Sequence, residues 1–156
     1  MNDPKPKLAL TSPDHSATLA RALGANLKAG DVVLMEGDVG AGKTHFARSL
    51  IQSLLPQIED VPSPTFTLVQ IYDTVKGEIW HSDLYRLTSP DEAVELGLED
   101  AFSEAICLVE WPDRLAELAP DHALHLSFSV TGDNTRALEL RWSDAKWQAK
   151  LAGIMA

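Results

Sequence analysis

The sequence predicts an α/β domain in which helices cover both faces of a central sheet. Two short runs, 32–35 and 106–109, are apolar at every position, as is typical of strands buried on both sides. The first run lies between two segments with helical spacing, so the chain begins as helix, strand, loop and helix. At 156 residues we expect a single domain over 1–156, in which 1–7 form a flexible lead-in.

The two early helices are predicted from their end signals. Ser12 offers a capping side chain and Pro13 fits a first helical turn, so the first helix should begin there and end at Gly30. After a glycine-rich loop, apolar residues recur at helical spacing over 46–55, and Pro56 ends the pattern.

Two β-hairpins are also predicted, because each pair of β-rich or alternating segments flanks a turn. The paired segments are 66–72 with 78–82 and 124–130 with 137–142. Between the hairpins Ser89 begins a further helix, and a short helix from Ser143 ends the chain.

The charge balance bears on possible partners. The chain has 23 acidic and 13 basic residues, a net charge of −10. Direct binding to a nucleic-acid backbone depends on clustered Lys and Arg, so a role near RNA would have to run through a partner protein.

Other features concern the compartment. The sequence shows neither an apolar run long enough to span a bilayer nor a signal peptide, which favours a cytoplasmic location without membrane attachment. A single cysteine excludes an intramolecular disulfide, and Cys107 within an apolar run is expected to be a buried thiol.

The loop at 37–44 reads GDVGAGKT and matches G-x-x-x-x-G-K-[ST]. Its glycines let successive backbone N–H groups face phosphates, and the following helix presents its positive end to the anion. Lys43 is expected to bridge the β- and γ-phosphates, and the Thr44 hydroxyl to ligate Mg²⁺. The predicted fold is therefore a three-layer P-loop NTPase-like domain with a mixed, mainly parallel central sheet and hairpin additions. The residues of this region expected to bind ATP are Asp38, Val39, Gly40, Ala41, Gly42, Lys43, Thr44 and His45.

Hydrolysis also needs a carboxylate at the metal and a group that places water. Glu110 directly follows the apolar run at 106–109, where a Walker B acid belongs, although a solvated strand-end carboxylate is the alternative. His81 and Asp83 share one face of a predicted strand, which would bring Asp83 to Mg²⁺; a surface histidine and a capping aspartate are the alternative. Thr65 follows Pro64 and would sense the γ-phosphate, unless it belongs to a plain turn.

An ordered series of motifs resembles the TsaE (YjeE) family, the ATPase component of the bacterial machinery that makes threonylcarbamoyladenosine in tRNA. The series spans roughly half the chain in the family's order. It comprises GDVGAGKT at 37–44, SPTFTLV at 63–69, HSDLYRL at 81–87, ELGLED at 95–100 and ICLVEWPDR at 106–114.

The resemblance implies roles for individual residues. Lys43, Thr65, Asp83 and Glu110 would be catalytic, and Thr44, Asp83 and Glu110 would hold the metal. Trp111 would lie beside the nucleotide, although packing is the alternative for this side chain. The base pocket would use the segment around Thr11–Asp14, before the first helix, and the late turn near Gly132. His45 departs from the small hydroxyl residue that is frequent in the family.

As a family member, the protein would bind and slowly hydrolyse Mg-ATP in support of a TsaD–TsaB pair, contacting tRNA only through these partners. Two other functions remain open at this point. A small-molecule kinase would need a lid with several arginines, for which Arg114, Arg136 and Arg141 are the candidates. A non-hydrolytic module would use bound ATP only to set a shape that partners recognise.

Overall fold

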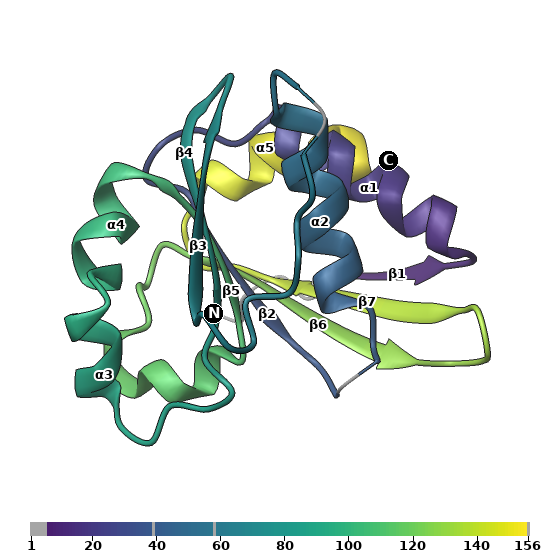
Figure 1. The fold of residues 1–156 in the computed structure, drawn as a ribbon. Helices are drawn as coiled ribbons and strands as arrows, with labels where there is room; N and C mark the ends of the chain where they lie inside the picture. Colours follow the sequence, from purple (N-terminus) through teal and green to yellow (C-terminus); the bar gives the residue numbers. More distant parts are fainter. Residues whose placement is uncertain (1–5, 39, 58, 156) are drawn as a thin grey trace.

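The computed structural model describes residues 6–38, 40–57 and 59–155 of the chain. Strands and helices alternate through most of its length (Figure 1). In chain order they are β1 (Lys7–Leu10), α1 (Pro13–Ala25), β2 (Val32–Glu36), α2 (Lys43–Leu54), β3 (Val69–Thr74), β4 (Gly77–Asp83), α3 (Pro90–Glu95), α4 (Leu98–Glu104), β5 (Ile106–Glu110), the 3₁₀ segment η1 (Pro112–Leu118), β6 (Leu124–Val130), β7 (Arg136–Arg141) and α5 (Lys146–Met155).

The seven strands form one sheet in the order β1-β7-β6-β2-β5-β4-β3. The four central strands, β6, β2, β5 and β4, are parallel to one another. The outer pairings, β1 with β7, β7 with β6 and β3 with β4, are antiparallel. The expectation of a mainly parallel sheet is therefore corrected: both predicted hairpins and β1 add antiparallel pairs, so the sheet is mixed in equal parts.

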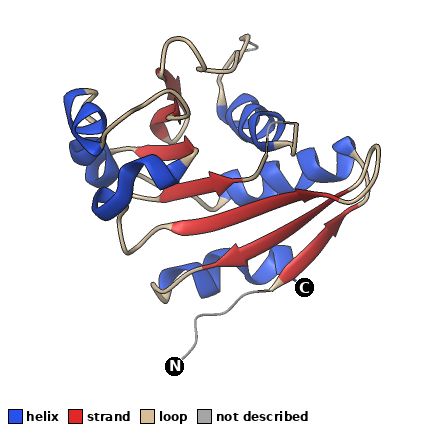
Figure 2. Cartoon of the chain, turned by 90° about the horizontal axis from the view of Figure 1, so that it is seen from below, coloured by secondary structure: helices blue, strands red, loops and turns tan. Residues whose placement is uncertain are grey.

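Helices cover both faces of the sheet (Figures 1 and 2). On one face α1, α2 and α5 contribute Leu23, Leu50 and Trp147 to a buried apolar cluster. On the other face α3, α4 and η1 enclose a second cluster that includes Phe102 and Leu115. The central strands supply side chains alternately to the two clusters, which explains why their sequences are apolar at every position.

Strand β5 shows this alternation and accounts for the single cysteine. Ile106 and Leu108 face the first cluster, whereas Cys107 and Val109 face the second. Cys107 is fully buried, as predicted, and burial raises the pKa of its thiol to about 12. A thiol held in its protonated form is a poor nucleophile and metal ligand, so Cys107 is a packing residue.

Several element boundaries differ from those predicted. Helix α1 begins as expected, with the Ser12 hydroxyl accepting the His15 N–H at 3.0 Å, but it ends at Ala25 rather than at Gly30. Gly30 instead adopts a φ of 94° in the turn that leads into β2. Strand β3 begins at Val69, three residues later than the predicted hairpin segment.

The first strand was not predicted. Lys7, expected in a flexible lead-in, lies in β1 and pairs with Glu139 of β7. Residues 1–5 of that predicted lead-in lie outside the described residues. Among the residues that the structure describes, none of the helices is long and apolar enough to cross a membrane.

The parallel strands bring three chain segments to one edge of the sheet. In the β4–β5 pairing Asp83 stands opposite Glu110, and in the β2–β5 pairing Glu110 stands opposite Met35. The loop after β2 therefore lies beside the carboxyl ends of β4 and β5. This edge is where open α/β sheets bind ligands.

Candidate functional site

The loop between β2 and α2 depends on glycine at its first position. Gly37 has a φ of 144°, and a Cβ there would lie 2.7 Å from the carbonyl oxygen of Phe128. Only glycine permits that approach of the loop to β6. Gly42, with a φ of 104°, caps the N-terminus of α2, so the helix starts at Lys43. The positive end of α2 therefore faces the loop.

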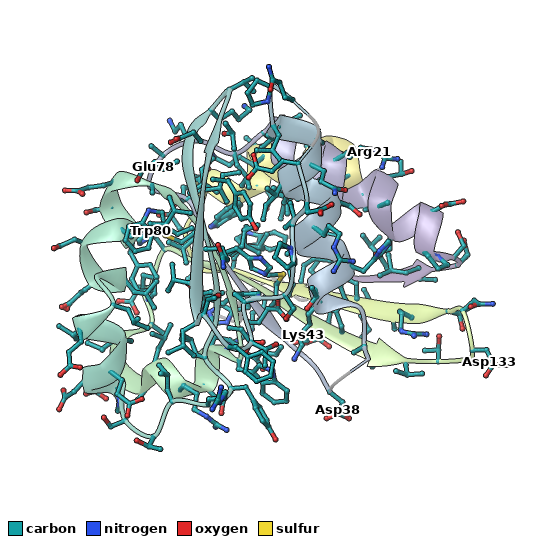
Figure 3. The ribbon with its side chains drawn as sticks, viewed as in Figure 1. Arg21, Asp38, Lys43, Glu78, Trp80 and Asp133 are labelled. Carbon is teal, nitrogen blue, oxygen red and sulfur yellow. The ribbon has the colours of Figure 1, made fainter. Side chains whose placement is uncertain are left out.

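The other loop residues differ in exposure. Asp38 is exposed at the loop tip, on the same edge of the molecule as Lys43 (Figure 3). Ala41 is buried and packs into the apolar core, so it anchors the loop. Gly40 lines a pocket described below. Val39, also expected to contact nucleotide, lies outside the described residues.

Lys43 is a buried cation at the centre of this edge. Its ammonium donates a hydrogen bond to the Gly37 carbonyl and lies 3.6 Å from the centroid of the Trp111 ring. Burial lowers the pKa of Lys43, and the nearby carboxylates of Glu110 and Asp83 act in the opposite direction. The side chain is thus held in place by a carbonyl and an aromatic face, and it forms no direct ion pair with any residue that the structure describes.

The two carboxylates predicted to act together lie side by side at the ends of β4 and β5. Thr44 donates from Oγ1 to Glu110 Oε1 at 3.0 Å, and Thr65 donates from Oγ1 to Asp83 Oδ2 at 3.3 Å. Asp83 and Glu110 are 5% and 2% exposed, so neither is a solvated strand-end residue. Asp83 Oδ1 also accepts the Tyr85 N–H at 3.0 Å, so this aspartate caps the following turn as well.

These residues surround a pocket of about 280 Å³. Thr65 reaches it from the loop before β3, where its hydroxyl also lies 2.7 Å from Ser63 Oγ. Trp111 and Tyr85 form an aromatic wall, with ring centroids 4.9 Å apart. The lining residues are Gly40, Lys43, Thr44, Ser63, Thr65, Asp83, Tyr85, Glu110 and Trp111.

The position of His81 departs from the alternative of a surface histidine. Its side chain is completely buried, and Nε2 lies 2.7 Å from Glu110 Oε2. Strand alternation placed His81 and Asp83 on one face but did not show that this face is buried beside Glu110. Tyr85 was also not singled out as a pocket residue from the sequence, although it lies in the same HSDLYRL motif, two residues after Asp83.

A second pocket lies on the other side of the loop, between the start of α1, α2 and the β6–β7 turn. His45 borders it and lies with Nε2 3.0 Å from the Pro13 carbonyl oxygen. Thr11 and Gly132, expected in a base pocket, are neighbours of the lining residues and do not line the pocket themselves. Its lining residues are Ser12, Pro13, Ser16, His45, Asp133, Asn134 and Arg136, and Figure 3 shows Asp133 at the end of the hairpin.

The arginines that a kinase lid would require are dispersed. Arg114 pairs with Asp113 at 2.7 Å, and Arg141 bonds His125 at the far end of β7. Only Arg136 reaches the loop, donating from Nη2 to the Gly40 carbonyl at 3.1 Å. The three side chains do not converge on one site.

The donor set suits a magnesium ion that is shared with phosphate. Thr44, Asp83 and Glu110 offer a hydroxyl and two carboxylates on one wall of the pocket. Within the described ranges, no group of three or more His, Cys, Asp or Glu side chains forms a metal site. Mg²⁺ is commonly held by one or two carboxylates together with substrate phosphates and water, so the residues present fit that ion.

The fold and the site define an α/β protein with a seven-stranded mixed sheet, in which a G-x-x-x-x-G-K-T loop joins a central strand to a helix. The model of one protein family, "Threonylcarbamoyl adenosine biosynthesis protein TsaE", matches residues 10–138. The chain belongs to the TsaE family, whose members are named for tRNA threonylcarbamoyladenosine biosynthesis.

Individual relatives agree with this assignment. The TsaE protein of Rickettsia bellii is 39% identical over 127 residues, covering 81% of this chain and 88% of that protein. The Bacillus subtilis TsaE protein is 35% identical over 134 residues, covering 85% of this chain and 82% of that protein. The crystal structure of Bacillus subtilis YdiB superposes with a TM-score of 0.81 at 28% identity, covering 98% of this chain and 95% of that one.

Proposed function

We propose that this TsaE protein is a P-loop ATPase that binds Mg-ATP, hydrolyses it slowly, and thereby supports a TsaD–TsaB pair in the threonylcarbamoylation of adenosine in tRNA. The observation that carries the proposal is the convergence of Lys43, Thr44, Asp83 and Glu110 on one pocket beside the loop. A buried cation, a hydroxyl and two buried carboxylates are the groups that phosphoryl transfer to water requires.

Nucleotide binding rests on the loop and on α2. The phosphates lie along the loop backbone at the N-terminus of α2, and Lys43 neutralises their charge. The pocket around Glu110 takes the γ-phosphate end, because Thr44 and both carboxylates lie there. The second pocket, bordered by His45 and Arg136, lies on the other side of the loop and takes the base end.

Hydrolysis uses the two carboxylates. Mg²⁺, when bound, offsets the charge that develops on the phosphate oxygens. Thr44 and Glu110 are in contact and provide the metal side of the pocket. Asp83 is in contact with Thr65, so this pair is placed to orient the attacking water and to respond to the γ-phosphate.

The charge of the chain supports an indirect role toward RNA. The net charge of −10 opposes binding to a phosphate backbone, so tRNA is contacted by the partner proteins. The names of the relatives refer to tRNA threonylcarbamoyladenosine biosynthesis, and this proposal extends that role to the present chain.

The decisive experiment measures ATP turnover by the purified protein, alone and with a TsaD–TsaB pair. We expect slow turnover alone and strong stimulation by the pair. ATP binding without stimulation would overturn the partner assignment and leave the nucleotide site in place. Absence of Mg-ATP binding would overturn the site itself.

A Glu110→Gln variant separates an ATPase from a binding module. This substitution keeps the size of the side chain and its contact with Thr44 but removes the charge. We expect ATP binding with little hydrolysis, and partner-dependent tRNA modification that stops after few turnovers. Modification that continues over many turnovers would favour the module.

A further inference from the structure

The most deeply buried polar contact of the site involves a histidine to which the proposed function assigns no role. His81 on β4 is 0% exposed, and its Nε2 lies 2.7 Å from Oε2 of Glu110 on β5. A carboxylate oxygen accepts hydrogen bonds, so the Nε2 of His81 is the donor in this contact. The two side chains are 0% and 3% exposed, so bulk water has little access to this contact.

The parallel pairing of β4 and β5 fixes the two backbones. His81 stands opposite Leu108, two positions before the pair formed by Asp83 and Glu110. The Glu110 side chain therefore turns back along the strand to meet the imidazole. Without that donor, rotation about its side-chain bonds would let the carboxylate leave this position.

Thr44 meets the same carboxylate from α2. Its Oγ1 lies 3.0 Å from Oε1 and 3.2 Å from Oε2 of Glu110. Glu110 is thus held between a histidine on β4 and a hydroxyl at the start of α2. The histidine contact lies on the buried side, and the threonine contact lies on the pocket side, because Thr44 and Glu110 line the pocket whereas His81 does not.

A stability role is a poor explanation for this pair. Burying an imidazole and a carboxylate has a desolvation cost that an apolar pair of similar volume avoids, and such replacements are frequently neutral or stabilising. Among the described residues, the buried Nδ1 atom of His81 has no hydrogen-bond partner, which adds to the cost. An arrangement with this cost is better explained by what it does for Glu110.

We infer that His81 is a positioning residue that holds Glu110 in the orientation needed for Mg²⁺ at the nucleotide. It acts through Glu110 and touches neither nucleotide nor metal. The inference rests on the proposed function, because it assigns a task to His81 within the same site. Outer partners of metal-binding carboxylates typically change metal affinity by about 10–100-fold when they are removed.

The test compares nucleotide affinity with Mg²⁺ and with EDTA for three variants of His81. His81→Leu removes the donor, and His81→Asn retains an amide that is too short to reach Glu110. His81→Gln places its amide nitrogen near the former Nε2 position and should restore the contact in part. Affinity for a fluorescent ATP analogue is measured across a Mg²⁺ titration, and circular dichroism verifies that each variant is folded.

We expect His81→Leu and His81→Asn to need about 10–100-fold more Mg²⁺ for the same tightening of nucleotide binding. Their affinity in EDTA should equal that of the wild type, and His81→Gln should lie in between. If His81→Leu does not fold, His81→Asn decides. Wild-type Mg²⁺ dependence in the folded donor-free variants would overturn the inference.

A matched control is His122→Leu. His122 is a partly buried histidine that bonds the Gly30 carbonyl at 3.0 Å, at the opposite end of β2 from the loop. The His122→Leu substitution should lower the stability of the fold but leave the Mg²⁺ dependence of nucleotide binding unchanged. If the wild type itself shows no Mg²⁺-dependent binding, the proposed function fails; if it does and the His81 variants match it, only the role of His81 fails.

Discussion

Arg136 donates a hydrogen bond from Nη2 to the carbonyl oxygen of Gly40 across 3.1 Å, joining the β6–β7 hairpin to the loop between β2 and α2. The same guanidinium donates from Nη1 to the carbonyls of Gly132 and Thr135, at 3.0 Å and 2.8 Å. Within the described residues, Arg136 forms no ion pair with a carboxylate. It therefore ties a turn to the loop, and its positive charge lies at the second pocket.

We predict that Arg136→Gln weakens ATP binding about tenfold. Hydrogen bonds to charged groups contribute about 1.5–3 kcal/mol, and the partial exposure of Arg136 places the effect at the lower end. Titration calorimetry with ATP measures the change. Arg141→Gln is the control, because Arg141 lies on the same strand and bonds His125 away from the loop. Equal losses in both variants would contradict a specific role for Arg136.

Lys43→Met should lose ATP binding without losing stability. Removing the partner of a buried charge typically costs 2 kcal/mol or more, so affinity should fall by roughly 30-fold or more. Burial lowers the pKa of Lys43 below its ordinary value of 10.5, so the folded protein disfavours the charged form despite the carboxylates nearby. The variant should therefore unfold at the same or a higher temperature at pH 7.

The difference in unfolding temperature between Lys43→Met and the wild type should depend on pH, because the pKa of Lys43 is lowered in the folded protein. A lysine whose pKa is lower in the folded state lowers stability while it is charged in both states. This penalty disappears as pH rises through the folded pKa toward 10.5. The gap in unfolding temperature between Lys43→Met and wild type should therefore narrow from pH 7 to about pH 10. A variant markedly less stable than wild type at pH 7 would contradict the prediction.

ATP should change the fluorescence of Trp111. The Lys43 ammonium lies 3.6 Å from the centre of this indole ring, and bound phosphates should draw it away. Trp111→Phe should remove the ATP-dependent change in emission. Trp80→Phe is the control, because Trp80 does not line the pocket and bonds Glu78 at 3.2 Å. A response that persists in Trp111→Phe would show that another tryptophan reports binding.

The elements that build the site were predicted from the sequence better than the strand β1 at the edge of the sheet. The all-apolar strands β2 and β5, the capped start of α1 and both hairpins follow from local patterns. Strand β1 has only four residues, and its partner β7 lies about 130 residues later, so no local signal marks it. Such non-local pairing depends on tertiary packing, which short patterns do not record.

Within the site, spacing was informative where chemistry dictates it. The loop motif pointed to Lys43 and Thr44 and the strand end to Glu110, and the structure brings these three residues to one pocket. The burial of His81 could not be predicted, since alternation assigns a face without showing what covers it. The reach of Arg136 to Gly40 likewise depends on how the β6–β7 hairpin lies beside the loop.

The buried carboxylate at the opposite end of β2 offers a stability prediction separate from the proposed nucleotide site. Asp31 is 1% exposed and pairs with two lysines of α5, Lys146 at 2.8 Å and Lys150. Burial raises the pKa of Asp31, but hydrogen bonds from both lysines and from the Lys28 N–H outweigh it, so the pKa is lowered overall. Asp31→Asn should destabilise the fold by about 2 kcal/mol, below the 3–5 kcal/mol typical of a broken buried pair, because both lysine heads retain access to water.

The loss of stability in the Asp31→Asn variant should become smaller as the pH falls, because the pKa of Asp31 is lowered in the folded protein. A carboxyl group with a lowered folded pKa contributes stability above its unfolded pKa, near 4, and loses it as pH falls through the folded value. The difference between wild type and Asp31→Asn should thus be full at pH 7 and shrink below about pH 4. Thermal unfolding across this range measures it, with ATP affinity at pH 7 as the control. Reduced ATP affinity in the folded variant would contradict the separation of the two ends of β2.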